Sequence, residues 1–213
     1  MIICKVMTRN PVFIHTDMSI NEARSLMDAK KIGHLPVLSK SNELVGLVTR
    51  KDLVKAGPSA ATSLDMYEIS YLLTKIKVKD VMEKKVLTVE ENEVVEEAAR
   101  IMADNAIGCL PVMNGKLLVG IITDTDIFHV FLNAFGARHA GLRISLLIED
   151  KPGQLARLFN AIAEKGGNVV AFVTSDRENL SRCRATIKVT GLSREDAEKI
   201  LQNFNDMELE DLR

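Results

Sequence analysis

The sequence predicts a mixed α/β (α+β) protein in which a β-α-β-β-α unit occurs twice and a β-α-β-β-α-β unit follows. The first observation is a heptapeptide of glycine, two aliphatic residues, threonine, two polar residues and aspartate, found at 46–52 and again at 120–126. The second is a change of pattern from residue 142 onward, where helical and alternating segments follow in a different order. We therefore expect a duplicated first part and a separate C-terminal domain.

The heptapeptide closes a longer repeat. Val6-Met7 is matched by Val81-Met82, and the segment 32–37 is matched by 107–112, each 75 positions later. A repeat of this length indicates two copies of one structural unit. Two such copies are expected to pair and to share a cleft.

The first half of each copy is predicted from capping and periodicity. A short extended run at 12–14 precedes Ser19 and Glu22, which form a capping box that begins a helix. We expect Gly33 to end this helix. Its buried stripe has helical spacing and consists of Ile20, Ala23, Leu26 and Met27.

The second half of each copy is a hairpin followed by a helix. Strands are expected at 35–38 and 44–48, and Thr49 begins the next helix. In the second copy, Asn114-Gly115 predicts a tight hairpin turn. Between the copies, the amphipathic segment 64–73 is expected to pack on the repeats. The expected boundaries are 1–56 and 78–132 for the repeats, 57–77 and 133–141 for linkers, and 142–213 for the last domain.

The last domain shows the order of a ferredoxin-like split unit. Pro152-Gly153 opens its first helix, Gly166-Gly167 stops it, and Ser193 caps the second helix. Strands are expected at 142–149, 169–173, 183–190 and 207–210.

Composition excludes several classes of function. The net charge is −1, with 46% hydrophobic and 27% charged residues, so nothing favours binding to nucleic acid or to an anionic membrane. No apolar run reaches membrane-spanning length. The cysteines, Cys4, Cys109 and Cys183, have neither the spacing of a zinc site nor that of a disulfide framework. We expect a cytoplasmic protein without a metal site.

The two Thr-x-x-Asp sequences, Thr49 to Asp52 and Thr123 to Asp126, allow two interpretations. At a strand-to-helix turn, each is a capping box. A helix N-terminus also suits phosphate, the threonine hydroxyl donates a hydrogen bond, and an aspartate accepts from ribose hydroxyls. Because both residues recur in paired repeats, the ligand interpretation gains weight. The glycines that open the two heptapeptides, Gly46 and Gly120, are expected to let a ligand approach the strand.

The two repeats resemble a tandem pair of CBS domains (a Bateman module). The resemblance lies in the early Val-Met, the helix stripe, the Gly-x-Leu-Pro-Val strand and the heptapeptide, and it covers about residues 1–132. It implies a sensor that binds an adenosine derivative (AMP, ADP, ATP or S-adenosylmethionine) between the repeats, with threonine at the phosphate and aspartate at the ribose. The residues that it assigns to the base and to the entry loop are Thr8, Val12, Ile32, Gly33, His34, Ile107, Gly108 and Cys109.

The two implied sites differ in one entry-loop residue. Thr8 is expected beside Thr49 and Asp52, and its counterpart Glu83 beside Thr123 and Asp126, with Leu87 as the counterpart of Val12. A carboxylate repels a phosphate, so the first site is expected to bind a phosphorylated ligand more tightly.

Residues 142–213 resemble an ACT domain. The resemblance rests on Asp150-Lys151-Pro152-Gly153-Gln154-Leu155 and on Gly167-Asn168-Val169. It implies pairing of two chains and an amino-acid site, with Asp150, Gly153 and Asn168 as candidates. The same residues are also explained as a helix start and a turn.

We therefore expect a regulatory protein that is not an enzyme, has no catalytic cofactor and forms a homodimer. The domain order resembles that of a family of acetoin utilization proteins, which implies a link to acetoin or related carbon metabolism. An alternative is a ligand-free scaffold that docks a metabolic enzyme. A catalytic role for His34 with Cys4 or Cys109 lacks a third, orienting group.

Overall fold

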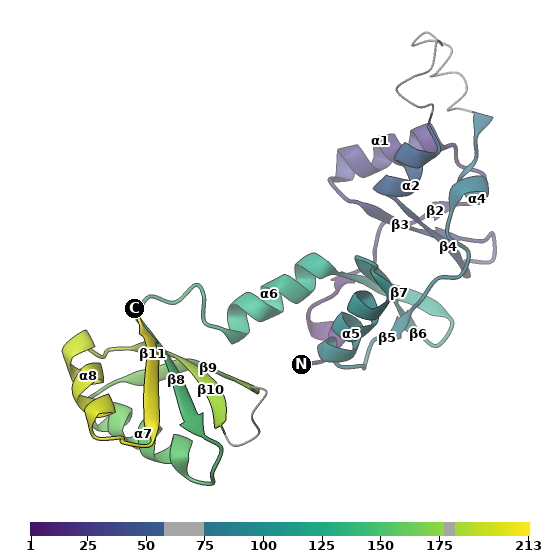
Figure 1. The fold of residues 1–213 in the computed structure, drawn as a ribbon. Coiled ribbons are helices and arrows are strands. Elements are labelled where there is room, and N and C mark those ends of the chain that lie inside the picture. Colours follow the sequence, from purple (N-terminus) through teal and green to yellow (C-terminus); the bar gives the residue numbers. More distant parts are fainter. Residues whose placement is uncertain (58–74, 177–181) are drawn as a thin grey trace. The chain divides into compact units, whose positions relative to one another are not determined.

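The computed structural model describes residues 1–57, 75–176 and 182–213. It divides into two compact units, Met1–Ile127 and Phe128–Arg213 (Figure 1). The expected helical segment 64–73 lies outside the described residues, as does most of the first linker. Within the described ranges, no helix has both the length and the apolar character that crossing a membrane requires. The predicted α+β class is confirmed.

The first repeat begins with the predicted capped helix. In α1 (Ile20–Lys30), the Ser19 hydroxyl accepts from the backbone N–H of Glu22 at 3.2 Å, and the Glu22 carboxylate accepts from the N–H of Ser19 at 2.9 Å. The helix ends at Lys31, whose φ of 55° is left-handed. The prediction that Gly33 ends it was wrong, because the Lys31 N–H already closes the last turn on Asp28 and Met27.

A three-stranded sheet of order β2-β3-β4 completes this repeat. The core lies between the sheet and α1 and includes Met27, Leu35 and Val48, all fully buried. Because β4 runs directly into α2, Thr49 is both the last strand residue and the N-cap of the helix. The elements are β2 (Ile14–His15), β3 (His34–Leu38), β4 (Leu44–Thr49) and α2 (Arg50–Lys55).

The second repeat has the same order in a four-stranded sheet, β1-β7-β6-β5. The predicted turn at Asn114-Gly115 joins β6 to β7, with Gly115 at φ 58°. The last helix of the repeat, α6, begins in the first unit and ends in the second. The elements are β5 (Val89–Glu90), α5 (Val95–Asn105), β6 (Cys109–Asn114), β7 (Leu117–Thr123) and α6 (Asp124–Ala134).

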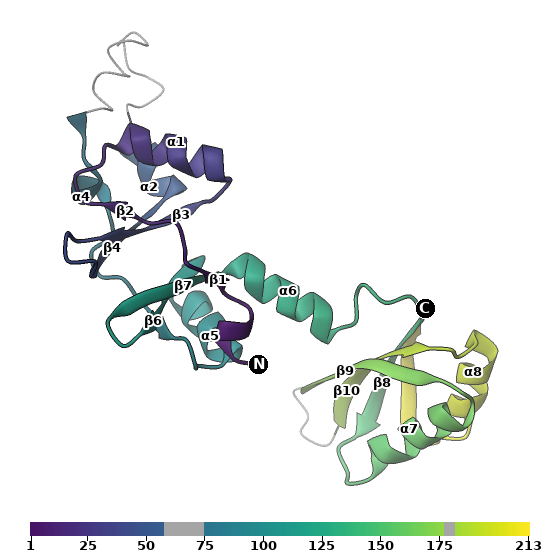
Figure 2. The same cartoon turned by 180° about the vertical axis from the view of Figure 1, so that it is seen from behind.

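The N-terminal segment of each repeat packs on the other repeat. β1 (Thr8–Arg9) follows the short helix η1 (Ile3–Lys5) and pairs with β7, as Figure 2 shows, with Thr8 opposite Ile121. Conversely, α4 (Val78–Val81) lies against the first repeat, where Val78 is fully buried in the core. Glu83, just after α4, bridges to Leu47 in β4. The two halves therefore exchange their first segments.

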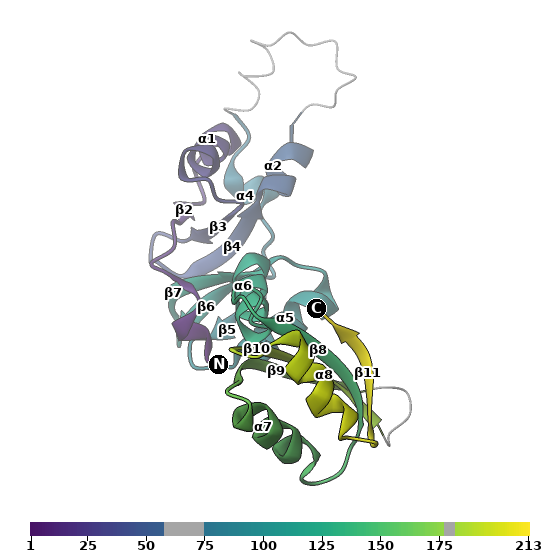
Figure 3. The same cartoon turned by 90° about the vertical axis from the view of Figure 1, so that its left-hand side faces the viewer.

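The second unit is a four-stranded antiparallel sheet of order β11-β8-β10-β9. Its two helices cover one face of the sheet (Figure 3), and Leu158, Ile162 and Ile200 on them pack against Ile144 and Ile187. The predicted element order is confirmed. The elements are β8 (Leu142–Glu149), α7 (Gln154–Glu164), β9 (Asn168–Asp176), β10 (Arg182–Thr190), α8 (Arg194–Gln202) and β11 (Met207–Leu212).

Candidate functional site

A cleft of about 630 Å³ lies between the two repeats of the first unit. Its lining comes from the first repeat at 33–34, 47 and 49–52, and from the second repeat at 83, 85–87 and 105–109. Both Thr49 and Asp52 line it. The shared cleft expected from the duplication is therefore present.

The Thr49–Asp52 pair forms a reciprocal capping box at the edge of this cleft. The N–H and the hydroxyl of Thr49 both donate to Oδ2 of Asp52, at 2.9 and 2.6 Å, and the Asp52 N–H returns a bond to Oγ1 of Thr49 at 3.3 Å. Thr123 and Asp126 form the same three bonds at 2.8, 2.8 and 3.4 Å. The capping interpretation therefore holds for both sequences. Each box also fixes its threonine and carboxylate at the start of a helix.

The entry-loop residues are exchanged relative to the prediction. Glu83 lines the cleft of Thr49, whereas Thr8 pairs with Ile121 in the strand that leads to Thr123. The predicted pairing was wrong because each N-terminal segment crosses to the other repeat. Glu83 also points back toward its own loop, where its Oε1 accepts from the N–H of Lys85 at 2.8 Å.

The structure brings together residues that the sequence had assigned to two separate pockets. The predicted residues that line the cleft are Gly33, His34, Thr49, Asp52, Ile107, Gly108 and Cys109. The predicted residues outside its lining are Thr8, Val12, Ile32, Thr123 and Asp126. Of these, Val12 packs against the core of the first repeat, and the carbonyl of Ile32 accepts from the Arg50 guanidinium at 3.1 Å.

The heptapeptide glycines make room for a methionine and not for a ligand. A Cβ built at Gly46 would overlap Sδ of Met82 and lie 3.1 Å from the carbonyl oxygen of Glu83. At Gly120, a Cβ would overlap Sδ of Met7 in the same way. The expectation of close ligand approach at these glycines was therefore wrong. Their small size lets the exchanged segments pack on β4 and β7.

The centre of the cleft is a poor place for nucleophilic catalysis. Burial lowers the pKa of His34, although the nearby carboxylates of Asp124 and Asp52 act in the opposite direction. Burial, together with Asp124, raises the pKa of the Cys109 thiol to about 12. A thiol with such a pKa stays protonated near neutrality, and the thiolate is the nucleophile. The geometry therefore gives no support to a His34–Cys109 pair.

Three cationic residues of the cleft were missed by the sequence interpretation: Arg50, Lys51 and Lys85. Arg50 forms an ion pair with Asp28. The ammonium groups of Lys51 and Lys85 form no ion pair with any residue that the structure describes. The sequence contains a signal for two of these cations, because the second heptapeptide has Asp124-Thr125 where the first has Arg50-Lys51.

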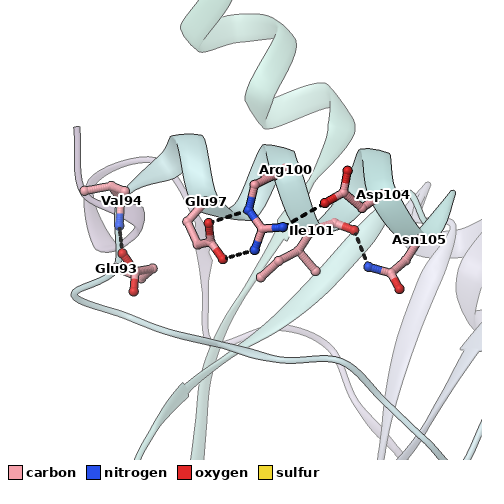
Figure 4. A network of polar contacts seen from close by, with 7 residues as sticks. All are labelled: Glu93, Val94, Glu97, Arg100, Ile101, Asp104 and Asn105. Carbon is pink, nitrogen blue, oxygen red and sulfur yellow. Dashed lines mark hydrogen bonds and ion pairs between the residues drawn. The ribbon is translucent and has the colours of Figure 1, made fainter.

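The end of α5 forms another part of the wall. Asn105 lines the cleft, and its amide donates to the carbonyl of Ile101 at 2.8 Å (Figure 4). One turn earlier, Arg100 bridges Glu97 and Asp104 on the surface of the same helix. These bonds hold the last turn of α5, which leads into the cleft residues 106–109.

The ACT-type candidates do not come together in one chain. Asp150 and Gly153 follow the C-terminal end of β8, and Gly153, at φ 89°, is the N-cap of α7. Asn168 begins β9 and pairs with Thr190 at the opposite end of β10. The strand β10 pairs with β8 near Glu149 at its other end. Across eight residues of strand, this separation is about 26 Å. A site containing all three residues would therefore require a second chain.

The described residues contain no group of three or more His, Cys, Asp or Glu side chains placed to hold a metal ion.

Comparisons with known proteins match both parts of the chain. A family model of the CBS domain matches residues 3–59 and 78–133, and a model of the TTHA0829-like ACT domain matches residues 140–213. A candidate acetoin utilization protein (AcuB) from Vibrio cholerae is 31% identical, with a TM-score of 0.53, and the match covers 65% of this chain and 95% of that one.

Two similar solved structures contain adenosine compounds. The CBS domain pair of protein MJ0100, solved with 5′-methylthioadenosine and S-adenosyl-L-methionine, is 26% identical with a TM-score of 0.53, covering 65% of this chain and 98% of that one. CBSX2, solved with AMP, is 29% identical with a TM-score of 0.50, covering 62% and 96%.

Several curated relatives are longer proteins. Homoserine O-acetyltransferase from Methanococcus vannielii is 33% identical over 127 residues, which are 59% of this chain and 24% of that protein. The chain spans between 22% and 38% of the length of the curated relatives that it matches first.

Proposed function

Because the chain belongs to the CBS-domain family and carries an ACT domain after its two CBS repeats, we propose that it is a regulatory protein that binds an adenosine-containing ligand between the repeats. The observation that carries this proposal is the cleft of about 630 Å³ that both repeats line. Small-molecule pockets typically have volumes of about 300–1,000 Å³. The cleft therefore has room for a nucleoside and its 5′ substituent.

The Thr49–Asp52 box suits the ribose and the 5′ substituent. Oδ2 of Asp52 already accepts both bonds from Thr49, which leaves Oδ1 to accept from two neighbouring ribose hydroxyls. The Thr49 hydroxyl lies beside it and can turn to a phosphate oxygen. The helix α2 has only six residues, so the positive charge near this point comes mainly from side chains and not from the helix dipole.

The part of the cleft at Gly33 and His34, next to Thr49 across the β3–β4 hairpin, suits a flat base. A Cβ built at Gly33 would meet nothing within 4 Å, so the backbone here is open on its cleft side. His34 and the 107–109 backbone of the other repeat line the same region. AMP in CBSX2 and 5′-methylthioadenosine with S-adenosyl-L-methionine in MJ0100 are the ligand types that similar proteins hold.

We further propose that the protein is not an enzyme, that it acts as a homodimer through its ACT domain, and that it regulates a metabolic enzyme. The likeness to the Vibrio protein supports a link to acetoin or related carbon metabolism. Binding would act by favouring one arrangement of the repeats or of the paired chains. A ligand can shift such an equilibrium only by its difference in affinity for the two arrangements.

Isothermal titration calorimetry with AMP, 5′-methylthioadenosine and S-adenosylmethionine tests the site. We expect Asp52→Ala to weaken or abolish binding of the ligand held at Thr49. A matched control is Asp196→Ala, because Ser193 and Asp196 in the ACT domain form two of the three bonds of the Thr49–Asp52 box, the hydroxyl-to-carboxylate bond and the returning bond from the Asp196 N–H. Unchanged binding by the Asp52 variant would contradict the site, and no binding of any of the three compounds would contradict the proposed ligand class.

A further inference from the structure

Matched positions in the two CBS repeats carry different charges. The first two residues of α2 are Arg50 and Lys51, whereas α6 begins with Asp124 and Thr125. In the exchanged segments, Lys85 corresponds to the neutral Asn10 and Glu83 to the neutral Thr8, so the difference in net charge comes from the two helix starts. Both segments occupy matched places, since Glu83 bridges to Leu47 and Thr8 pairs with Ile121. The comparison is therefore between structurally matched surroundings.

In the Thr49 cleft, two cations are available to a ligand. Arg50 is held by Asp28 and by the Ile32 carbonyl, but Lys51 and Lys85 have no carboxylate partner among the described residues. The carboxylate of Glu83 is turned to the backbone N–H of Lys85. The cleft lining thus includes two lysines without an ion-pair partner among the described residues, Lys51 in the helix that follows Thr49 and Lys85 in the segment that follows α4.

At Thr123 an acidic residue replaces Arg50, and neutral residues replace both lysines. Oδ1 of Asp124 accepts from the N–H of Thr125 at 2.6 Å and from its hydroxyl at 3.2 Å. Asp126 lies two residues further on in the capping box. A phosphate beside Thr123 would therefore meet the Asp124 carboxylate in addition to the capping carboxylate of Asp126, whose counterpart Asp52 is present in the first half as well. Like charges a few ångströms apart repel each other even near a protein surface.

On the premise that this CBS pair binds adenosine compounds, we propose that Lys51 and Lys85 select a 5′-phosphorylated adenosine at Thr49, and that Asp124 excludes a phosphate at Thr123. The chain then binds one anionic nucleotide and not two. Lys51 and Lys85 are specificity-determining residues. Their counterparts in the second half are the neutral residues Thr125 and Asn10.

The first test compares AMP with 5′-methylthioadenosine, which has no phosphate, by calorimetry on the full chain. We expect one AMP per chain. Lys51→Thr and Lys85→Asn each copy the other half, and each should weaken AMP binding about tenfold, as expected for a charged hydrogen bond. Binding of 5′-methylthioadenosine should change at most about twofold, because no phosphate contact is lost.

The matched control is Lys84→Asn. Lys84 is the neighbour of Lys85 but lines a different hollow, beside Glu43 and Thr88. The AMP affinity of this variant should stay within about twofold of the wild type's. The AMP affinity of the wild type should fall as the salt concentration rises, since salt screens exposed charges. An equal loss in the Lys84 and Lys85 variants would overturn the proposal, because it would indicate a general effect of charge.

A gain of function gives the second test. Asn10→Lys with Asp124→Asn and Thr125→Lys gives the second half both lysines and removes the repelling carboxylate without adding bulk beside Gly108 and His34, and the AMP stoichiometry should rise from one to two. Two AMP per wild-type chain, or unaltered AMP binding in both lysine variants, would overturn the charge selection and leave the proposed function intact. Binding of 5′-methylthioadenosine but not of AMP would likewise overturn the charge selection and leave the proposed function intact. No binding of either compound would instead contradict the proposed function.

Discussion

At the residue scale, the glycine that opens each heptapeptide has a packing role that can be measured. Gly46→Ala places a methyl group against Sδ of Met82 and near the Glu83 carbonyl. Overpacking of this kind costs about 1–3 kcal/mol. We expect urea unfolding to show a loss in this range, and Met82→Ala to relieve part of it in the double variant. Gly33→Ala is the control, because a Cβ there meets nothing within 4 Å, and a similar loss in that variant would contradict the explanation.

His34 predicts a dependence of stability on pH. Burial lowers its pKa in the folded chain, so the unfolded chain binds the proton first as the pH falls through about 6.5. Stability contributed by neutral His34 is therefore present above this pH and is lost below it, by at most about 1.4 kcal/mol per pH unit. Asp124 and Asp52 reduce the effect without reversing its sign.

The measurement is the urea-unfolding free energy at pH 5.5 and 7.5 for the wild type and His34→Gln. The wild type should lose more stability than the variant between these two pH values. Glu22 has a lowered carboxyl pKa because it accepts bonds from Ser19, so its contribution is lost only at lower pH. An equal pH dependence in both proteins would show that His34 is not the group responsible.

At the element scale, local signals in the sequence predict most helices and strands. Ser19, Ser193 and Thr49 are N-caps as expected, because capping depends on residues only three positions apart. The end of α1 was missed, because Lys31 adopts a left-handed conformation that a glycine usually provides. The exchange of β1 and α4 was also missed. It depends on pairing between segments far apart in the chain, such as Thr8 with Ile121.

The exchange predicts that neither repeat folds well alone. A fragment of residues 1–57 lacks Val78, which is fully buried in its core, and a fragment of residues 75–134 lacks β1. Each fragment should give poorly dispersed amide NMR spectra, and an equimolar mixture should recover dispersed signals. As a milder check in the full chain, Val78→Ala should destabilise by about 2 kcal/mol, the typical contribution of a buried aliphatic side chain. A folded 1–57 fragment would contradict the exchange.

At the scale of the whole molecule, the sequence predicts the repeats and their shared cleft better than it predicts which residues face that cleft. Duplication indicates a shared cleft, and Thr49, Asp52, His34 and Gly108 do line it. The sequence interpretation placed Glu83 in the other site, because it grouped residues by their order in the chain. The charge contrast between Arg50-Lys51 and Asp124-Thr125 is visible in the sequence, but it acquires meaning only when the structure shows which residues face one cleft.

The ACT domain leads to a prediction about assembly. Its sheet has β9 and β11 as edge strands, and edge strands offer unpaired backbone groups to another chain. A site that combined Asp150 and Asn168 would also need a second copy, since these residues lie at opposite ends of the sheet. We therefore expect light scattering after size exclusion to show a dimer for the full chain and a monomer for residues 1–134.

The shortened chain separates pairing from ligand binding. It retains the whole lining of the cleft and the first unit's own core, so its affinity for AMP should stay within about threefold of the full chain's, a difference of less than about 0.7 kcal/mol. A dimer of the shortened chain would assign pairing to the CBS repeats. A large loss of AMP affinity in the monomer would instead mean that pairing through the ACT domain helps to form the cleft, and that the two domains act as one sensor.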